Sequence, residues 1–200
     1  MNALVKYGLI AAAVLGFYFY NQSQDGGVSY TEDDIDLNAV LDVTIDTIYA
    51  YQEEIGGQPQ DELNEDNVFV EFAGRLETSY NAAAPALHTA PIGVAPMADA
   101  SVMAYEDLDG NREMGESEEA LFMVEIDGEN SRVIASSRSG AINDHSFSGT
   151  GLLAGYLIGS LLSRQRLAGV NTGNLANKKP VTASAAARSR ARSGSHSRGK

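Results

Sequence analysis

A continuous apolar segment near the N-terminus places the strongest constraint on how this chain can fold. Residues 4–20 read LVKYGLIAAAVLGFYFY, and Lys6 is the only charged residue among them. As a helix this segment would be about 25 Å long, a little shorter than the ~30 Å hydrocarbon core of a bilayer. Such a surface has to be removed from water, either in a membrane or against other apolar groups.

The sequence predicts that residues 1–20 are a membrane anchor. The side chain of Lys6 is long enough to extend to the membrane surface, and the aromatic residues 17–20 lie where an interfacial belt is expected. A cleaved signal peptide and a buried helix of a soluble protein are the alternatives, although no small residues suit a cleavage site near Tyr20. Since Lys6 lies at the N-terminal end of the segment and acidic residues follow it, we expect the acidic part outside the cytoplasm.

Charge divides the chain into two unequal parts. The formal net charge is -13, yet all 27 acidic residues lie within residues 1–150, whereas residues 151–200 hold nine basic residues and no acidic one. Cysteine is absent. This absence excludes disulfides, thiolate zinc sites and cysteine nucleophiles.

After a polar spacer at residues 21–29, the pattern predicts a small acidic α+β domain over residues 30–138. Residues 34–54 have helical periodicity, with Tyr49 on the apolar stripe and Tyr51 off it. Residues 67–73 alternate with a period of two and predict a strand, and residues 82–100 are rich in Ala and Pro and predict a linker. We expect one amphipathic helix and an antiparallel sheet of three or four strands, with the later strands at residues 101–106, 120–126 and 132–136.

The remaining residues are predicted to contain little folded structure. Residues 139–150 are expected to form a loop, residues 151–163 a short Gly-rich apolar helix, and residues 164–200 a basic disordered tail. The short helix is about 18 Å long, which is too short to cross a bilayer unaided.

Small residues recur every four positions in both apolar segments, which places them on one helix face. Such faces let helices approach closely, so we expect pairing of the two segments, or of each with a copy of itself or with a membrane protein. Spacing by chance is the alternative. The residues are Gly8, Ala12 and Gly16 in the first segment and Gly151, Gly155 and Gly159 in the second.

Residues 107–118 have the ligand spacing of a calcium-binding loop. Oxygen-bearing side chains at alternating positions followed by a distal Glu can surround a hard cation. Arg112 departs from the pattern, because it takes the sixth position, where a sharp turn requires Gly. A plain hairpin loop is the alternative. The candidate ligands are Asp107, Asp109, Asn111, Glu113 and Glu118.

The C-terminal basic residues predict electrostatic binding to an anionic lipid or another polyanion of the cell envelope. Nucleic acid is the less favoured partner, because no aromatic residues lie among the basic ones to stack on bases. A solubilising tail, or a tail that folds against the acidic domain, are the alternatives. The residues are Lys178, Lys179, Arg188, Arg190, Arg192, Arg198 and Lys200.

The stretch LAGYLIG at residues 153–159, together with the basic end from Arg188, resembles the YgiB-like group of small bacterial envelope proteins. The resemblance covers about a quarter of the chain. It implies a bacterial envelope setting and no particular activity.

These observations favour a membrane-anchored envelope protein that acts by binding or assembly. A calcium-dependent extracytoplasmic adhesion or sensing module, and an extracytoplasmic enzyme with a site of carboxylates, are the alternatives. We identify no catalytic residues, because His88, His145 and His196 are scattered and have no nucleophile or ligand at a suitable spacing. Calcium is the one candidate for a bound cofactor.

Overall fold

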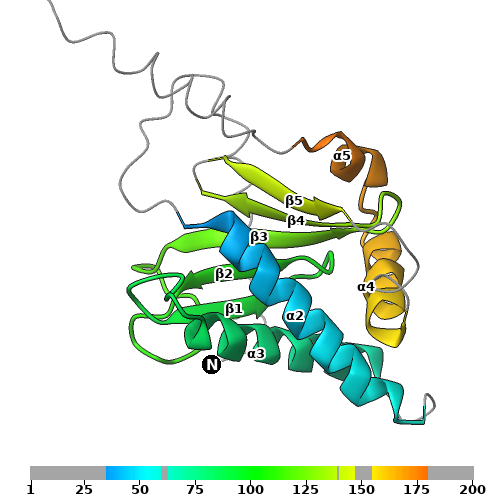
Figure 1. The fold of residues 1–200 in the computed structure, drawn as a ribbon, viewed down its shortest axis with the longest axis horizontal. Helices are drawn as coiled ribbons and strands as arrows, with labels where there is room; N and C mark the ends of the chain where they lie inside the picture. Colours follow the sequence, from blue (N-terminus) through cyan, green and yellow to red (C-terminus); the bar gives the residue numbers. More distant parts are fainter. Residues whose placement is uncertain (1–34, 60–62, 139, 147–154, 180–200) are drawn as a thin grey trace, which may run out of the picture.

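The structure, a computed structural model, describes residues 35–59, 63–138, 140–146 and 155–179, which form an α+β fold (Figure 1). The five strands of its antiparallel sheet are arranged in sequence order, so each strand pairs with the one before it. The strands are β1 (Ile92–Pro96), β2 (Val102–Glu106), β3 (Ala120–Asp127), β4 (Arg132–Ser137) and β5 (Ile142–Ser146). The described helices are α2 (Leu37–Gly56), α3 (Glu65–Ala82), α4 (Tyr156–Leu167) and α5 (Thr172–Asn177).

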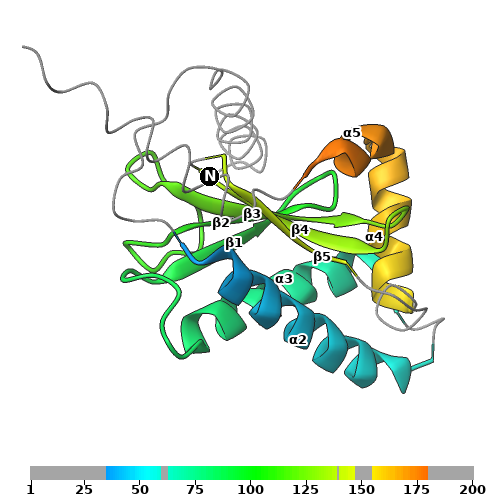
Figure 2. The same cartoon turned by 45° about the horizontal axis from the view of Figure 1, so that its top comes forward.

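One face of the sheet, called here the first face, is covered by α2 and α3 (Figure 2). Inward-facing strand residues such as Ala104, Phe122 and Val133 are fully buried in the main core together with residues of both helices. The ring of Tyr80 on α3 meets that of Phe122 edge-on, with ring centres 5.2 Å apart. The Tyr80 hydroxyl lies 2.7 Å from the hydroxyl of Thr44 on α2, which joins the two helices by a buried hydrogen bond.

The opposite, second face of the sheet is also apolar. Because side chains alternate along a strand, Met103, Met123 and Ile134 point away from α2 and α3, and none of them belongs to the main core. Met103 and Ile134 are 0% exposed and Met123 is 8% exposed. In Figure 2, α5 lies on this side of the sheet, opposite to the two long helices.

The predicted helix at residues 34–54 is confirmed as α2, with a different buried stripe. The helix begins after Asp36, whose carboxylate accepts hydrogen bonds from the amides of Asn38 and Ala39. Tyr51, expected off the stripe, is 2% exposed, whereas Tyr49 is 50% exposed. The stripe shifts because Thr44 and Thr47 are buried, each donating its hydroxyl hydrogen to a backbone carbonyl one turn earlier.

The strand predicted at residues 67–73 is wrong, because these residues belong to α3. A window of seven residues is too short to distinguish this alternation from the spacing of a helix face. Over the whole segment the buried residues Val68, Phe72, Leu76 and Tyr80 recur every four positions, which is the spacing of one helix face. The Asn64 side chain caps this helix by accepting hydrogen bonds from two backbone amides of the first turn.

Three predicted strands are confirmed as β2, β3 and β4, and the sheet is larger than expected. The predicted linker at 82–100 contains β1, and the predicted loop at 139–150 contains β5. Both are edge strands of five residues. Their sequences, IGVAP and INDHS, carry Gly, Pro, Asn and Asp, which are depleted in strands, so pairing with a neighbouring strand outweighs weak propensity.

The fold continues beyond residue 138 through α4 and α5, so residues 164–179 differ from the expected disordered tail. In α4 the buried residues are Leu157, Ile158, Leu161, Ser160 and Gln165. Within the described parts of the chain, we find no helix whose length and apolar character would let it span a bilayer. The predicted anchor at 1–20 and the spacer at 21–29 lie outside the described residues.

Gly93 on β1 predicts a sharp difference between two Gly-to-Ala variants. A Cβ atom at Gly93 would lie 2.4 Å from the buried ring of Tyr105, whereas one at Gly74, exposed on α3, would have nothing within 4 Å. We expect Gly93→Ala to lower the free energy of unfolding by about 1–3 kcal/mol through overpacking. Gly74→Ala should raise it by roughly 0.5–1 kcal/mol. Urea unfolding of both variants measures this, and equal effects would contradict the packing of Tyr105 over Gly93.

Candidate functional site

The loop between β2 and β3 brings together three of the five predicted calcium ligands. One carboxylate oxygen from each of Asp107, Asp109 and Glu118 lies within 4.8 Å of the other two. Asp107 and Glu118 are buried and Asp109 is exposed. Asn111 contacts Asp109, whereas Glu113 is exposed and is not part of the three-carboxylate cluster.

Hydrogen bonds within the loop hold these carboxylates in place. Glu118 accepts from the backbone amide of Leu108 at 2.8 Å with one oxygen and from that of Gly115 at 2.7 Å with the other. Asp109 accepts from the backbone and side-chain amides of Asn111. The loop is therefore shaped by its own acidic residues, and a hard cation would have to share the oxygens that already accept these bonds.

Arg112, the departure from the calcium pattern, adopts the backbone geometry that the pattern requires. Its φ angle is +60°, in the left-handed region that usually favours Gly. Its guanidinium extends away from the loop and pairs with Glu77 on α3, with 3.0 Å between nitrogen and oxygen. The sixth position thus adopts this conformation without Gly, and the ion pair joins the loop to α3.

A second charged cluster joins the C-terminal residues to the sheet. Arg132 is buried at the start of β4 and donates to Asp127 at 3.1 Å and to Asp144 at 2.6 Å. It also donates to the backbone carbonyls of Leu175 and Lys178, at 2.8 and 3.0 Å. With a further bond from its Nε to Asp127, all five donor hydrogens of the guanidinium have an acceptor.

Electrostatics favours the charged forms in this cluster. Burial alone raises the pKa of Asp127, but hydrogen bonds from Asn130 and Arg132 outweigh burial and hold the pKa below its ordinary value. Burial likewise lowers the pKa of Arg132, and its bonds to Asp144 and Asp127 raise it overall. The pair is therefore ionised in the folded chain, and it fixes α5 against the end of the β3–β4 hairpin.

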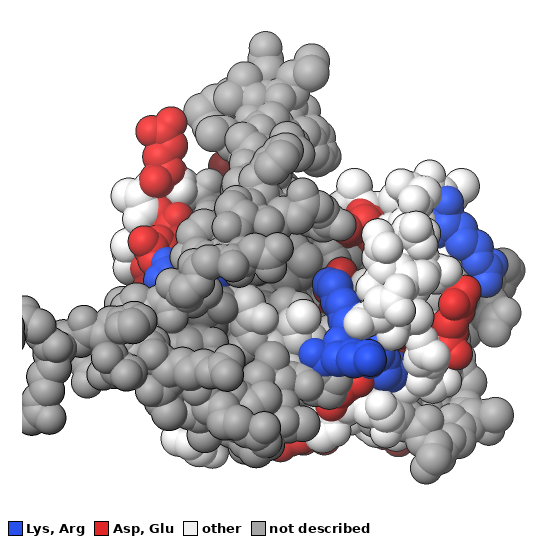
Figure 3. All heavy atoms as spheres, turned by 90° about the horizontal axis from the view of Figure 1, so that it is seen from above, with Lys and Arg blue, Asp and Glu red and all other residues white. Residues whose placement is uncertain are grey.

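The predicted polyanion-binding residues are divided by this arrangement. Lys178 forms an ion pair with Glu125 on β3, which places its charge in the fold. Lys179 is exposed. In Figure 3 basic and acidic side chains lie beside each other on the described surface at the right. The other predicted residues lie outside the described residues: Arg188, Arg190, Arg192, Arg198 and Lys200.

The predicted glycine face is described only in part. Gly155 precedes α4 with a φ of +127°, and Gly159 is exposed, with nothing within 4 Å of an added Cβ atom. Within the described residues α4 packs through its Leu and Ile side chains, and the Gly159 side faces solvent. Pairing through this face stays a prediction, and Gly8, Ala12, Gly16 and Gly151 lie outside the described residues.

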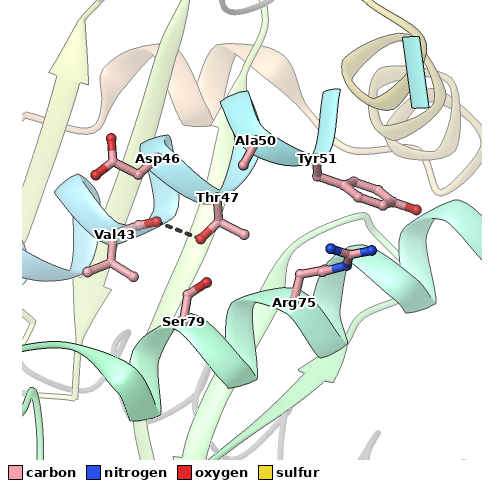
Figure 4. Close-up of a pocket in the computed structure, with 7 residues that line it drawn as sticks. All are labelled: Val43, Asp46, Thr47, Ala50, Tyr51, Arg75 and Ser79. Carbon is pink, nitrogen blue, oxygen red and sulfur yellow. Dashed lines mark hydrogen bonds between the residues drawn. The ribbon is translucent and has the colours of Figure 1, made fainter. Parts of the chain in front are cut away.

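A groove of about 340 Å³ opens to solvent between α2 and α3 (Figure 4). Its lining residues are Val43, Asp46, Thr47, Ala50, Tyr51, Arg75 and Ser79. The guanidinium of Arg75 lies 5.4 Å from the centre of the Tyr51 ring and 2.6 Å from a carboxylate oxygen of Glu54. Tyr51 donates to Glu71 at 2.9 Å, and burial, followed by this contact, raises its pKa. Arg75 and Tyr51 are thus each held by a residue of the other helix.

Within the described residues, the buried carboxylates Asp107 and Glu118 lie apart from Asp127. Asp107 and Glu118 lie before β3, whereas Asp127 is its last residue. The eight residues of β3 separate them by roughly 23 Å at ~3.3 Å per residue. His88 pairs with Glu106 at 2.8 Å and His145 with Asp42 at 3.2 Å, which accounts for two of the three histidines.

Sequence reasoning missed the groove and the Arg132 cluster. The sequence patterns predict a strand at residues 67–73 and no element at residues 74–81, so they do not place Arg75 and Ser79 on a helix. The sequence does carry a start signal for α3, because Asn64 is a favourable capping residue and the acidic Glu65 and Asp66 follow it. No local sequence pattern predicts the Arg132 cluster, because the hydrogen-bond acceptors of Arg132 come from three separate segments of the chain.

Comparisons with known protein families, with curated proteins and with solved structures found no match for this chain. The similarity to the YgiB-like group therefore stays a prediction.

Removing the buried guanidinium should destabilise the fold far more than removing an exposed one. Arg132→Met leaves the buried Asp127 without its partner, and we expect a loss of about 3–5 kcal/mol in the free energy of unfolding. The control is Arg138→Met, because Arg138 pairs with Glu119 where both side chains are about half exposed. That variant should lose about 0–1 kcal/mol. Denaturant unfolding near pH 7 compares the two.

The Arg132 effect should also depend on pH. Because folding lowers the pKa of Asp127, its contribution is present above the ordinary carboxyl pKa and is lost as pH falls through the lowered value. The difference between the wild-type chain and Arg132→Met should therefore shrink below about pH 4. A difference that stays constant down to pH 2 would contradict the charge pairing.

Proposed function

We propose that this chain acts by binding, and that the groove between α2 and α3 receives a basic segment of a partner protein. The observation that carries the proposal is the groove itself, which is open and lined by two helices of strongly acidic composition. The proposal needs no membrane anchor. The expected anchor and extracytoplasmic location stay predictions.

Charge supports a basic partner. Together α2 and α3 contain eight acidic residues and one basic residue, Arg75. Asp46 is exposed on α2 and lines the groove, and Asp42 and Glu53 are exposed elsewhere on the same helix. A surface of one sign raises the association rate of an oppositely charged partner and disfavours partners of the same sign.

The shape of the groove supports an extended segment. The lining residues follow α2 from Val43 to Tyr51 and α3 from Arg75 to Ser79, so the groove runs along the two helices. Ala50 and the half-buried Val43 offer apolar contact, and the charge of Arg75, which also lines the groove, is paired with Glu54. An aliphatic Lys stem could lie on the apolar part while its ammonium group reaches the acidic rim.

Blocking the groove should weaken binding of a basic peptide. We expect a fluorescein-labelled octalysine peptide to bind the full chain and to be released as salt rises. Ala50→Arg places bulk and positive charge in the groove, and it should weaken binding about tenfold, or ~1.4 kcal/mol. Fluorescence anisotropy at matched salt measures this.

The matched control is Val70→Arg, which makes the same charge change at a residue of α3 that is 59% exposed and outside the groove lining. Equal affinities of the two variants would show that binding depends only on the net charge of the chain and not on the groove. No binding of octalysine at low salt would refute a basic partner.

Calcium binding by the β2–β3 loop is a second candidate function, favoured by the convergence of Asp107, Asp109 and Glu118. Loops of this kind outside cells bind calcium with dissociation constants of about 0.1–1 mM. At ~10 mM calcium such a site would stabilise the native chain by about 1.4–2.7 kcal/mol. This adhesion or sensing role is independent of the groove.

Calcium should raise the melting temperature by several degrees if the loop binds it. Asp109→Asn should abolish the shift, because it removes a ligand charge while an amide oxygen remains to accept from Asn111. Glu116→Gln is the control, since Glu116 is exposed in the same loop and is not one of the three clustered carboxylates. A shift that is absent, or that survives in Asp109→Asn, would reject the site. Thermal unfolding of the full chain, with and without calcium, provides the measurement.

A further inference from the structure

The second face of the sheet lacks a described layer that matches its apolar character. α2 contacts β4 and β5, α3 contacts β1, and α4 contacts α2 and α3, so these three helices belong to the first face. Of the described helices, α5 lies on the second side, where the carbonyl of Leu175 accepts from Arg132 at one end of the sheet. The middle of the face is left to Met103, Met123 and Ile134.

This face has the composition of an interior surface. Ala95 pairs with Met103, Met103 with Met123, and Met123 with Ser136, so these residues form a row across four strands. The ring of Tyr105 on β2 covers Gly93 of the neighbouring strand β1. A sheet with two apolar faces requires a layer on each, because exposed methionine and isoleucine side chains cost about 1.5–3 kcal/mol each.

Ser136 adds a polar detail to the same row. Its hydroxyl oxygen is the one buried side-chain oxygen or nitrogen without a hydrogen-bond partner found in the described parts of the chain. An unsatisfied buried hydroxyl costs about 1–3 kcal/mol. A covering layer at this position should therefore bring a donor or an acceptor among its apolar groups.

We propose that the apolar segment Leu4–Tyr20 of this same chain covers the second face of the sheet. The segment is apolar throughout apart from Lys6, and it contains Tyr7, Tyr18 and Tyr20, whose hydroxyls can hydrogen-bond a group such as that of Ser136. It therefore supplies both properties that the face requires. The inference concerns a different surface from the groove, and it stands independently of the proposed function.

Dimensions agree with this occupant. A helix of 17 residues is about 25 Å long, and the outer strands of a five-stranded sheet lie about 19 Å apart. Gly8, Ala12 and Gly16 would give such a helix one side of small residues, which permits close approach to bulky methionines.

The position of α2 makes the face reachable. Asn143 on the edge strand β5 donates to Asn38 in the first turn of α2 at 3.3 Å, so the chain before Ile35 leaves the described fold beside the sheet edge. Residues 21–34 can span at most about 46–50 Å when extended. That length is enough to pass the β5 edge and reach the other side.

Disulfide trapping in the full chain tests the proposal, since the chain has no natural cysteine. Ala11→Cys, Ala12→Cys and Ala13→Cys would each be combined with Met123→Cys, so that three consecutive positions sample different directions. A disulfide requires Cβ atoms about 3.5–4.5 Å apart. We expect at least one pair to form an intramolecular bond on mild oxidation, roughly tenfold faster than the same position paired with Tyr49→Cys.

Tyr49 provides the control because it is half exposed on α2, on the other side of the sheet. Ala95→Cys replaces Met123→Cys if the latter does not fold, since Ala95 is only half buried on the same face. We also expect the wild-type chain to stay in the supernatant when vesicles of phosphatidylcholine alone are sedimented. Neutral lipid is used because the basic C-terminal residues are expected to bind anionic lipid.

Three results would overturn the proposal. Disulfides that form between two molecules would make a second copy the occupant. Equal rates with Tyr49→Cys would show that the segment does not pack on the second face. Sedimentation of the wild-type chain with the vesicles, together with no trapped pair, would return the segment to its expected role as a membrane anchor.

Discussion

The fold depends on one constraint, which is that a five-stranded antiparallel sheet has to bury two apolar faces. Side chains alternate along each strand, so Val133 and Ala135 point into the helical core while Ile134 points the other way. All three are 0% exposed. The helices α2 and α3 cover only one of these two faces. The strands therefore specify a second layer as firmly as they specify the first.

Among the described residues, buried carboxylates lie at two places, one at each end of β3. At one end of β3, Glu118 shapes its loop by accepting from the amides of Leu108 and Gly115. At the other end, Asp127 and Arg132 hold α5 to the hairpin. In both places the charge is compensated by several hydrogen bonds, which offset the cost of removing it from water.

Local sequence patterns predicted the α+β class, α2 and the three central strands, because these elements carry regular periodicity and clear turn signals. The Asp127 turn is one example, since its side chain accepts from Asn130. The edge strands β1 and β5 were missed, because their residues have weak strand propensity and are ordered by a neighbour. Of the five predicted calcium ligands, Asp107, Asp109 and Glu118 lie together in the structure, and calcium binding itself stays a prediction. The Arg132 cluster and the groove depend on contacts distant in sequence, such as that between Arg132 and Leu175.

The two faces of the sheet are mechanically linked, and this gives the second layer a consequence for binding. β4 carries Ile134 on one face and Val133 and Ala135 on the other, and α2 packs directly on β4 and β5. Cores are close-packed, so a shift on one side of a strand is transmitted to the side chains on the other. Loss of packing around Ile134 would therefore shift the strand surface on which α2 packs. Such a shift would also change the distance between α2 and α3 along the groove. The groove that we propose as a partner site is therefore only as well defined as the packing on the opposite face of the sheet.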